Sequence, residues 1–214
     1  MADSSSKEVI LKKIRKALIE STPLPFPLSE GSHSLYQPSQ KELEIQFAEE
    51  FSKLQGRFAF CLNHAELCQQ LNALIAEKNW SKIYCVEPIL KSILTTGGFT
   101  GLSTETSLVD CDASITTCES LVARTGSMIL TAASQSGRTV SVYAPVHICI
   151  AYTKQLVYDI KDALQSIKEK YGANIPSLIS LASGPSRTAD IEKTLVTGVH
   201  GPKEVYLFLI DTSS

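Results

Sequence analysis

Three short segments of the sequence combine glycine with hydroxyl and arginine side chains, the groups that commonly hold carboxylates and phosphates. An arginine can grip such an anion through two parallel hydrogen bonds. The residues that these segments and their flanks offer as ligand-binding candidates are Thr125, Gly126, Ser127, Arg138, His147, Ser183, Gly184, Ser186, Arg187, Thr188, Asp190 and His200. We therefore predict a site for a small carboxylate or a phosphorylated compound.

The richest segment follows an apolar stretch at 177–181 that predicts a strand. The turn at 183–185 would lie just past the carboxyl end of this strand, where open α/β sheets bind their ligands. Residues 190–195 predict a helix, and the free N–H groups at its start would favour an anion. Asp190 and Glu192 would lie in its first turn and repel a bare phosphate, so a ligand held by arginine, serine and threonine fits better.

The same residues also have a purely structural interpretation. Ser186 or Thr188 could cap the predicted helix, Asp190 could pair with Arg187 or Arg138, and the glycines could simply permit tight turns. The sequence leaves both interpretations open, although it favours the ligand site.

Two of the candidates are histidines, and for each a functional role is weighed against a structural one. His147 starts an apolar strand, where it could be a general base or could fix the preceding loop through a hydrogen bond; the structural role is favoured. His200 lies in a loop between glycines and is the better candidate for reaching a site. Because no carboxylate motif accompanies them, we predict no metal site.

The six cysteines give no sign of a cluster or zinc site. They are 7 to 31 positions apart in succession, and no C-x-x-C occurs. Ferredoxin-type clusters and zinc ribbons need closely spaced thiolates. Most of these cysteines lie in apolar segments, so we predict reduced core thiols and no cofactor.

Composition narrows the class of protein further. The chain has 214 residues, 43% hydrophobic and 20% charged, with a net charge of −2, which is typical of a globular protein. This charge balance gives no reason to expect nucleic acid or a membrane surface as partner. No apolar run is long enough to span a bilayer and no signal peptide is evident, so the expected compartment is the cytoplasm.

Apolar runs alternate with amphipathic helical patterns from residue 57 onward. We predict strands at 57–62, 82–86, 107–109, 114–116, 127–131, 139–143, 147–152, 177–181 and 204–210. We predict helices at 5–20, 39–54, 63–75, 88–96, 119–124, 155–171 and 190–195. Such an alternation predicts a three-layer α/β/α domain with a mostly parallel sheet.

The N-terminal part has a different character. Residues 1–38 predict an amphipathic, basic helix and a proline-rich connector, and residues 39–214 the compact domain. The apolar stripe of the helix must be buried somewhere, so it could dock on a second copy of the chain or on a partner.

Several motifs occur in a characteristic order. They are TGS at 125–127, GR at 137–138, PVHI at 145–148, SGPSRTADIE at 183–192 and GVHGP at 198–202. In this order they resemble the signature of the lactate utilization protein C family, also called the LUD domain. The resemblance is close over roughly residues 105–210 and makes 39–214 the expected LUD domain.

The resemblance implies a NagB/RpiA/CoA transferase-like fold, similar to sugar-phosphate isomerases and glucosamine-phosphate deaminases. It also implies a role in oxidising L-lactate to pyruvate beside two iron–sulfur-type partner proteins, in a subunit that carries no cluster ligands of its own. Many relatives have an acidic residue before the Thr-Gly pair, where this chain has Arg124. Any role of that acid does not transfer.

The sequence thus favours a non-cluster subunit of an L-lactate oxidation system that binds a small anionic ligand. The alternatives are an independent enzyme or ligand-binding protein of the same fold, and an interaction scaffold. A ligand site requires the polar groups to converge on one cleft, and we expect them at the carboxyl edge of the sheet.

Overall fold

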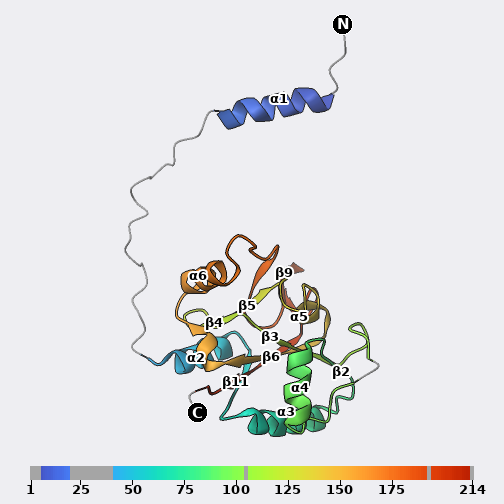
Figure 1. Cartoon of the computed structure of the whole chain (residues 1–214). Coiled ribbons are helices and arrows are strands. Elements are labelled where there is room, and N and C mark those ends of the chain that lie inside the picture. The colour runs from blue at the N-terminus through green and yellow to red at the C-terminus, as the bar shows by residue number, and fades with distance from the viewer. Residues whose placement is uncertain (1–5, 20–40, 104–105, 192–193, 213–214) are drawn as a thin grey trace. The chain divides into compact units, whose positions relative to one another are not determined.

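The computed structural model describes residues 6–19, 41–103, 106–191 and 194–212. The chain divides into two compact units, with the boundary at residues 37 and 38. The first unit contains helix α1 (Ser6–Ile19), which confirms the helix predicted there (Figure 1). The apolar side chains of α1 that the structure describes are exposed, as are its basic ones.

The second unit is built on a parallel sheet, as predicted. Within the described residues this main sheet has five strands in the order β1-β11-β6-β3-β2, all of them parallel. The strands are β1 (Arg57–Cys61), β2 (Ile83–Tyr84), β3 (Ala113–Thr117), β6 (Val146–Tyr152) and β11 (Glu204–Ile210). All five lie within or next to predicted strands, because strands buried on both faces have continuous apolar sequences.

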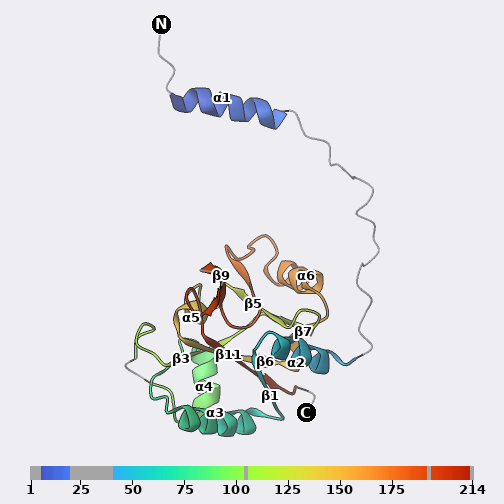
Figure 2. The same ribbon diagram turned by 180° about the vertical axis from the view of Figure 1, so that it is seen from behind.

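Different layers cover the two faces of the main sheet. Helices α3 (His64–Lys78) and α4 (Pro88–Thr96) pack on one face, where Ile148 and Ile150 of β6 point. Helix α2 (Leu43–Lys53) and a second sheet pack on the other, where Cys149 and Ala151 of the same strand point (Figure 2). This two-residue alternation along one strand divides the core into two halves.

The second sheet was not expected as a separate layer. Its order is β7-β4-β5-β8, and its outer face packs on helix α6 (Ile160–Tyr171). Its strands are β4 (Ser120–Val122), β5 (Ser127–Thr131), β7 (Leu156–Val157) and β8 (Ile179–Ala182). The helix predicted at 119–124 is therefore wrong. Its apolar centre is fully buried as strand β4, antiparallel to β5.

Three further element predictions are wrong in type. The strand predicted at 139–143 is the short helix α5 (Val140–Tyr143), and the helix predicted at 190–195 is a hairpin of β9 (Arg187–Ile191) and β10 (Thr194–Thr197). The segment 107–109 forms no strand, and its Val109 is exposed. Without a helix at 190–195, the expected anion site at a helix N-terminus does not exist.

Helix α6 begins later than predicted. Asp159 caps its N-terminus by accepting a hydrogen bond from the N–H of Lys161, whereas Leu156 lies upstream in β7. Ala163 and Ile167 face the core, while Leu164 is 39% exposed. The 3₁₀ turn η1 (Thr153–Gln155) connects β6 to β7.

We expect that a protein lacking residues 1–38 keeps the stability of the full chain to within about 0.5 kcal/mol, because the elements from α2 onward contain the buried clusters. Urea unfolding of both proteins measures this difference. Light scattering on the same samples measures association, which should fall if α1 docks on a second copy. Loss of cooperative unfolding in the shortened protein would contradict the division at residue 38.

Candidate functional site

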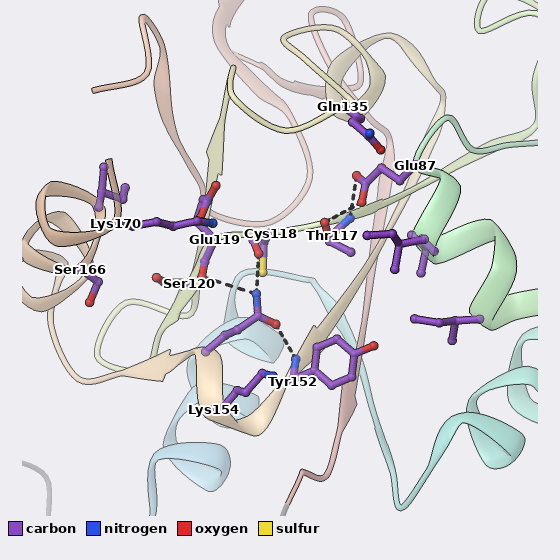
Figure 3. Close-up of a pocket in the computed structure, with 15 residues that line it drawn as sticks. Glu87, Thr117, Cys118, Glu119, Ser120, Gln135, Tyr152, Lys154, Ser166 and Lys170 are labelled. Atoms are coloured by element: carbon purple, nitrogen blue, oxygen red, sulfur yellow. Dashed lines mark hydrogen bonds and ion pairs between the residues drawn. The ribbon is translucent and has the colours of Figure 1, made fainter. Parts of the chain in front are cut away.

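A cavity of about 440 Å³ opens at the carboxyl edge of the main sheet. Part of its polar lining comes from residues at or just after the ends of three parallel strands. Glu87 follows β2, Thr117 ends β3, and Tyr152 ends β6. Helices α4 and α6 contribute the remaining walls (Figure 3). Open α/β sheets bind their ligands at this edge.

Glu87 is the most unusual side chain of the cavity. It is 7% exposed, and among the described residues it is the one buried side chain of the Asp, Glu, Lys and Arg types. Its Oε1 accepts hydrogen bonds from the Thr117 N–H at 3.1 Å and the Ser136 hydroxyl at 2.5 Å. Its Oε2 accepts one from the Thr117 hydroxyl at 2.6 Å. All three donors are neutral, so no cation within the described residues pairs with this buried acid.

The backbone explains where Glu87 lies. Pro88 occupies the first turn of α4, a position that does not need a backbone N–H donor. Glu87 therefore becomes the residue just before the helix, yet its side chain makes no capping bond and turns to β3 instead.

A second acid of the cavity is fully paired. Glu119 accepts hydrogen bonds from Lys170 Nζ at 2.6 Å, the Tyr171 hydroxyl at 2.5 Å and the Thr131 hydroxyl at 3.1 Å. Burial alone would raise the pKa of Glu119, but the bonds from Lys170 and Tyr171 and the charge of Lys170 outweigh burial and lower the pKa. The bond to Glu119 likewise raises the pKa of Lys170.

Lys154 supplies a cation that no acid neutralises. It lies in η1, is exposed, and its Nζ is 5.5 Å from the centroid of the Tyr152 ring. Within the described residues it makes no salt bridge. The Tyr152 hydroxyl lies 3.1 Å from His64 Nε2, and burial raises the pKa of this tyrosine.

The cavity therefore offers two complementary groups. Figure 3 shows Glu87 beside Gln135 at one end and Lys154 at the other. A hydrogen-bond acceptor and an ammonium group facing one space suit a small molecule with a donor at one end and an anionic group at the other.

The residues predicted from the sequence lie elsewhere. His147 begins β6 and is paired in register with Val205 at the start of β11, so it lies at the amino edge of the main sheet. It is 1% exposed, and its Nε2 is 2.8 Å from the Thr116 hydroxyl. Burial lowers the pKa of His147 to about 4, which fits the structural alternative.

Five of the predicted residues gather around the end of α2, which leads into the start of β1. Ser127 and Ser183 are hydrogen bonded at 2.7 Å, and Arg187 donates to the Leu54 carbonyl. A side chain on Gly126 would collide with the backbone of Glu50 and Phe51, and one on Gly184 with the Leu54 carbonyl. The neighbouring Thr125 has a buried hydroxyl with no partner among the described residues.

The other predicted residues do not join this group. Arg138 donates to the Ser177 hydroxyl at 2.6 Å, beyond the end of β5 that is opposite Ser127. The N–H of Ser186 donates to the Pro202 carbonyl, next to the loop of His200. Thr188 and Asp190 lie in β9, and the side chain of Asp190 is outside what the structure describes. The expected convergence on the carboxyl edge is therefore wrong.

A second cavity of about 440 Å³ lies at the amino edge of the main sheet. It is lined by Tyr143 and Pro145, which precede β6, and by His200 and Lys203, which precede β11. His200 thus faces a cavity, as the sequence analysis expected of a residue in this loop.

A model of the LUD domain matches residues 45–210. This chain belongs to the LUD domain family. Its central parallel sheet with flanking helices is shared with the crystal structure of a DUF162 family protein from Deinococcus radiodurans, at a TM-score of 0.60 and 20% identity, over 81% of this chain and 99% of that one.

Curated relatives resemble part of this LUD domain. An uncharacterized protein of Neisseria meningitidis serogroup B is 36% identical over 46% of this chain and 42% of its own length. Lactate utilization protein C of Bacillus subtilis is 36% identical over 45% of this chain and 42% of its own length, and that of Bacillus licheniformis is 38% identical over the same shares. The chain thus spans less than half the length of these relatives.

No three histidine, cysteine, aspartate or glutamate side chains of the described residues come together as metal ligands. No described helix is both long and apolar enough to cross a membrane.

The sequence analysis missed Glu87, Thr117, Ser136, Lys154 and Lys170. One signal pointed to the first two. Both follow segments predicted as parallel strands, and the rule that ligands bind at carboxyl ends applies to them as well as to residues 183–185. Ser136 follows a strand of the second sheet and Lys170 lies in α6, so both reach the site only because this sheet and helix pack beside the main sheet. Nothing in their local sequence indicates that packing.

Proposed function

We propose that this LUD domain serves in lactate utilization, as a subunit without an iron–sulfur cluster that works beside iron–sulfur-type subunits. The names of the relatives from three Bacillus and Shouchella species support the first part. The wide spacing of the cysteines supports the second. All six are buried and free, and burial raises the pKa of Cys61 and of Cys85 to about 11, which disfavours the thiolate that would bind iron.

We further propose that the carboxyl-edge cavity binds a small carboxylate such as lactate. The observation that carries this proposal is Lys154, an exposed cation on the cavity wall without an acidic partner in the described residues. A hydrogen bond to a charged group contributes about 1.5–3 kcal/mol. The long stem of lysine lets its ammonium group follow a ligand that sits deeper in the cavity.

Replacing Lys154 with methionine should weaken L-lactate binding about 10- to 100-fold, because one charge-assisted hydrogen bond is lost while the apolar stem is kept. Titration calorimetry of the full chain with sodium L-lactate measures this change. Fold stability should stay within about 0.5 kcal/mol, since the side chain is exposed.

The matched control is Lys203→Met. Lys203 lines the amino-edge cavity beside His200, makes no salt bridge within the described residues, and offers the second candidate site for the anion. Of the residues predicted from the sequence, His200 lines this cavity, and Ser186 is next to it through the hydrogen bond from its N–H to the Pro202 carbonyl. Loss of binding in Lys203→Met with full binding in Lys154→Met would move the ligand to the amino edge and refute the carboxyl-edge assignment.

A further inference from the structure

We propose that Glu87 makes the carboxyl-edge cavity selective for 2-hydroxy acids over the corresponding 2-keto acids. This inference rests on the proposed function, because it assumes that the same cavity receives the carboxylate. It adds the residue that selects the hydroxy acid over the keto acid.

The hydrogen bonds that Glu87 already accepts determine how many more it can accept from a ligand. A carboxylate offers about four acceptor positions and no donor. Three are occupied, two by Thr117 and one by Ser136. Because these donors come from β3 and from the loop after β5, they fix the carboxylate while leaving about one acceptor position for a ligand.

The remaining position discriminates between a hydroxyl and a ketone. A hydroxyl on C2 of the ligand can donate a hydrogen bond to Glu87. A ketone oxygen has no proton to donate and would turn its lone pairs toward a buried acid that no cation neutralises. A site built to hydrogen-bond a hydroxyl therefore rejects an analogue that lacks it.

The distribution of polar groups orients the ligand. Glu87 and Lys154 both line the cavity, and the hydroxyl and carboxylate of a 2-hydroxy acid are on adjacent carbons, so the long stem of Lys154 has to bring its ammonium group to a ligand seated at Glu87. Ile89, Leu90 and Ile93 of α4 form an apolar wall, which suits the aliphatic substituent on C2. The other acid of the cavity, Glu119, also accepts three hydrogen bonds, but one comes from the Lys170 ammonium group, so its charge is already balanced by a cation.

The experiment measures dissociation constants of the full chain for L-lactate, pyruvate, propionate and L-alanine. Wild-type protein should bind L-lactate about 10- to 100-fold more tightly than pyruvate or propionate, the value of one hydrogen bond to a charged group. Glu87→Gln should reduce the preference over pyruvate to about threefold or less, since its amide can donate to a ketone oxygen. The control, Glu204→Gln, makes the same change in a half-buried acid at the amino end of β11, outside this cavity, and should keep the wild-type preference.

The outcomes separate the inference from the proposed function. Equal binding of lactate, pyruvate and propionate by the wild type, or an unchanged preference in a folded Glu87→Gln protein, overturns the inference while carboxylate binding stands. Tighter binding of L-alanine than of L-lactate also overturns it and assigns the site to amino acids. Absence of binding of all four compounds refutes the proposed function, and the inference with it. If Glu87→Gln does not fold, the preference of the wild-type protein for L-lactate over pyruvate and propionate still tests the inference.

Discussion

Replacing Gly126 with alanine should lower the free energy of unfolding by about 2–6 kcal/mol. The residue has φ of +58°, a conformation that costs a residue with a side chain about 1–3 kcal/mol. An added Cβ would also lie 2.4 Å from the backbone nitrogen of Phe51 and 2.6 Å from the carbonyl carbon of Glu50. Helix backbone cannot rotate aside as a side chain can, so α2 would have to shift, which adds about 1–3 kcal/mol. Urea unfolding measures the loss.

Gly137→Ala is the matched control for this prediction. Gly137 has a similar φ of +62°, but a Cβ there would meet no heavy atom within 4 Å. Gly137→Ala should therefore lower the free energy of unfolding only by the cost of the left-handed backbone conformation, about 1 kcal/mol. If both variants lose the same free energy, the contact between the β4–β5 turn and α2 does not constrain position 126.

Acidification from pH 7 to pH 4 should remove about 3 kcal/mol of stability through His147 alone. Burial lowers the pKa of this histidine from 6.5 to about 4. Between these values the unfolded chain takes up a proton that the folded protein does not, so stability falls as the pH falls. The loss accumulates at about 1.4 kcal/mol per pH unit over this window. Urea unfolding at several pH values measures the slope.

The control compares His147→Gln with His64→Gln. Glutamine at 147 cannot take up a proton, so its unfolding free energy should lose most of the slope between pH 6.5 and pH 4, whatever the absolute stability. His64→Gln makes the same replacement at an exposed histidine and is the matched control. Below pH 4.5, protonation of Glu119 adds a separate loss in all three proteins, because its pKa is lowered in the folded state. An unchanged slope in His147→Gln would contradict the assignment.

The main sheet could be predicted because its strands carry their signal locally. The runs at 57–62, 147–152 and 204–210 are apolar at nearly every position, which is typical of strands buried on both faces. The cap of α3 was equally readable: the Asn63 side chain accepts a hydrogen bond from the Glu66 N–H, as its position before an amphipathic stripe predicts.

The second sheet could not be predicted in the same way. The segment 119–124 has no clear period, and its state depends on partners far along the chain. Leu121 pairs with Met128 and with Leu156, and the carboxylate of Glu119 meets Tyr171. Tertiary contacts of this kind override local preference. The hairpin of β9 and β10 was likewise mistaken for a helix at 190–195, although Arg187 and Thr188 pair with Thr197 and Val196 across it.

The candidate site was misplaced because the sequence analysis followed motifs and not strand direction. The Gly-rich segments gather mainly at the amino edge of the main sheet, where Gly126 and Gly184 permit close packing against α2. The carboxyl edge carries ordinary residues such as Glu87 and Thr117, whose importance comes from burial and hydrogen bonding and not from an unusual local sequence.

The position of β11 has a consequence for how this domain is made in the cell. It lies between β1 and β6, although it is the last of the main-sheet strands in sequence. A nascent chain that has not yet reached residue 204 therefore has two open strand edges in the middle of its sheet. Such edges are templates for pairing with other chains. The main sheet therefore closes in one late step, and the yield of folded domain depends on how fast that strand is inserted compared with aggregation.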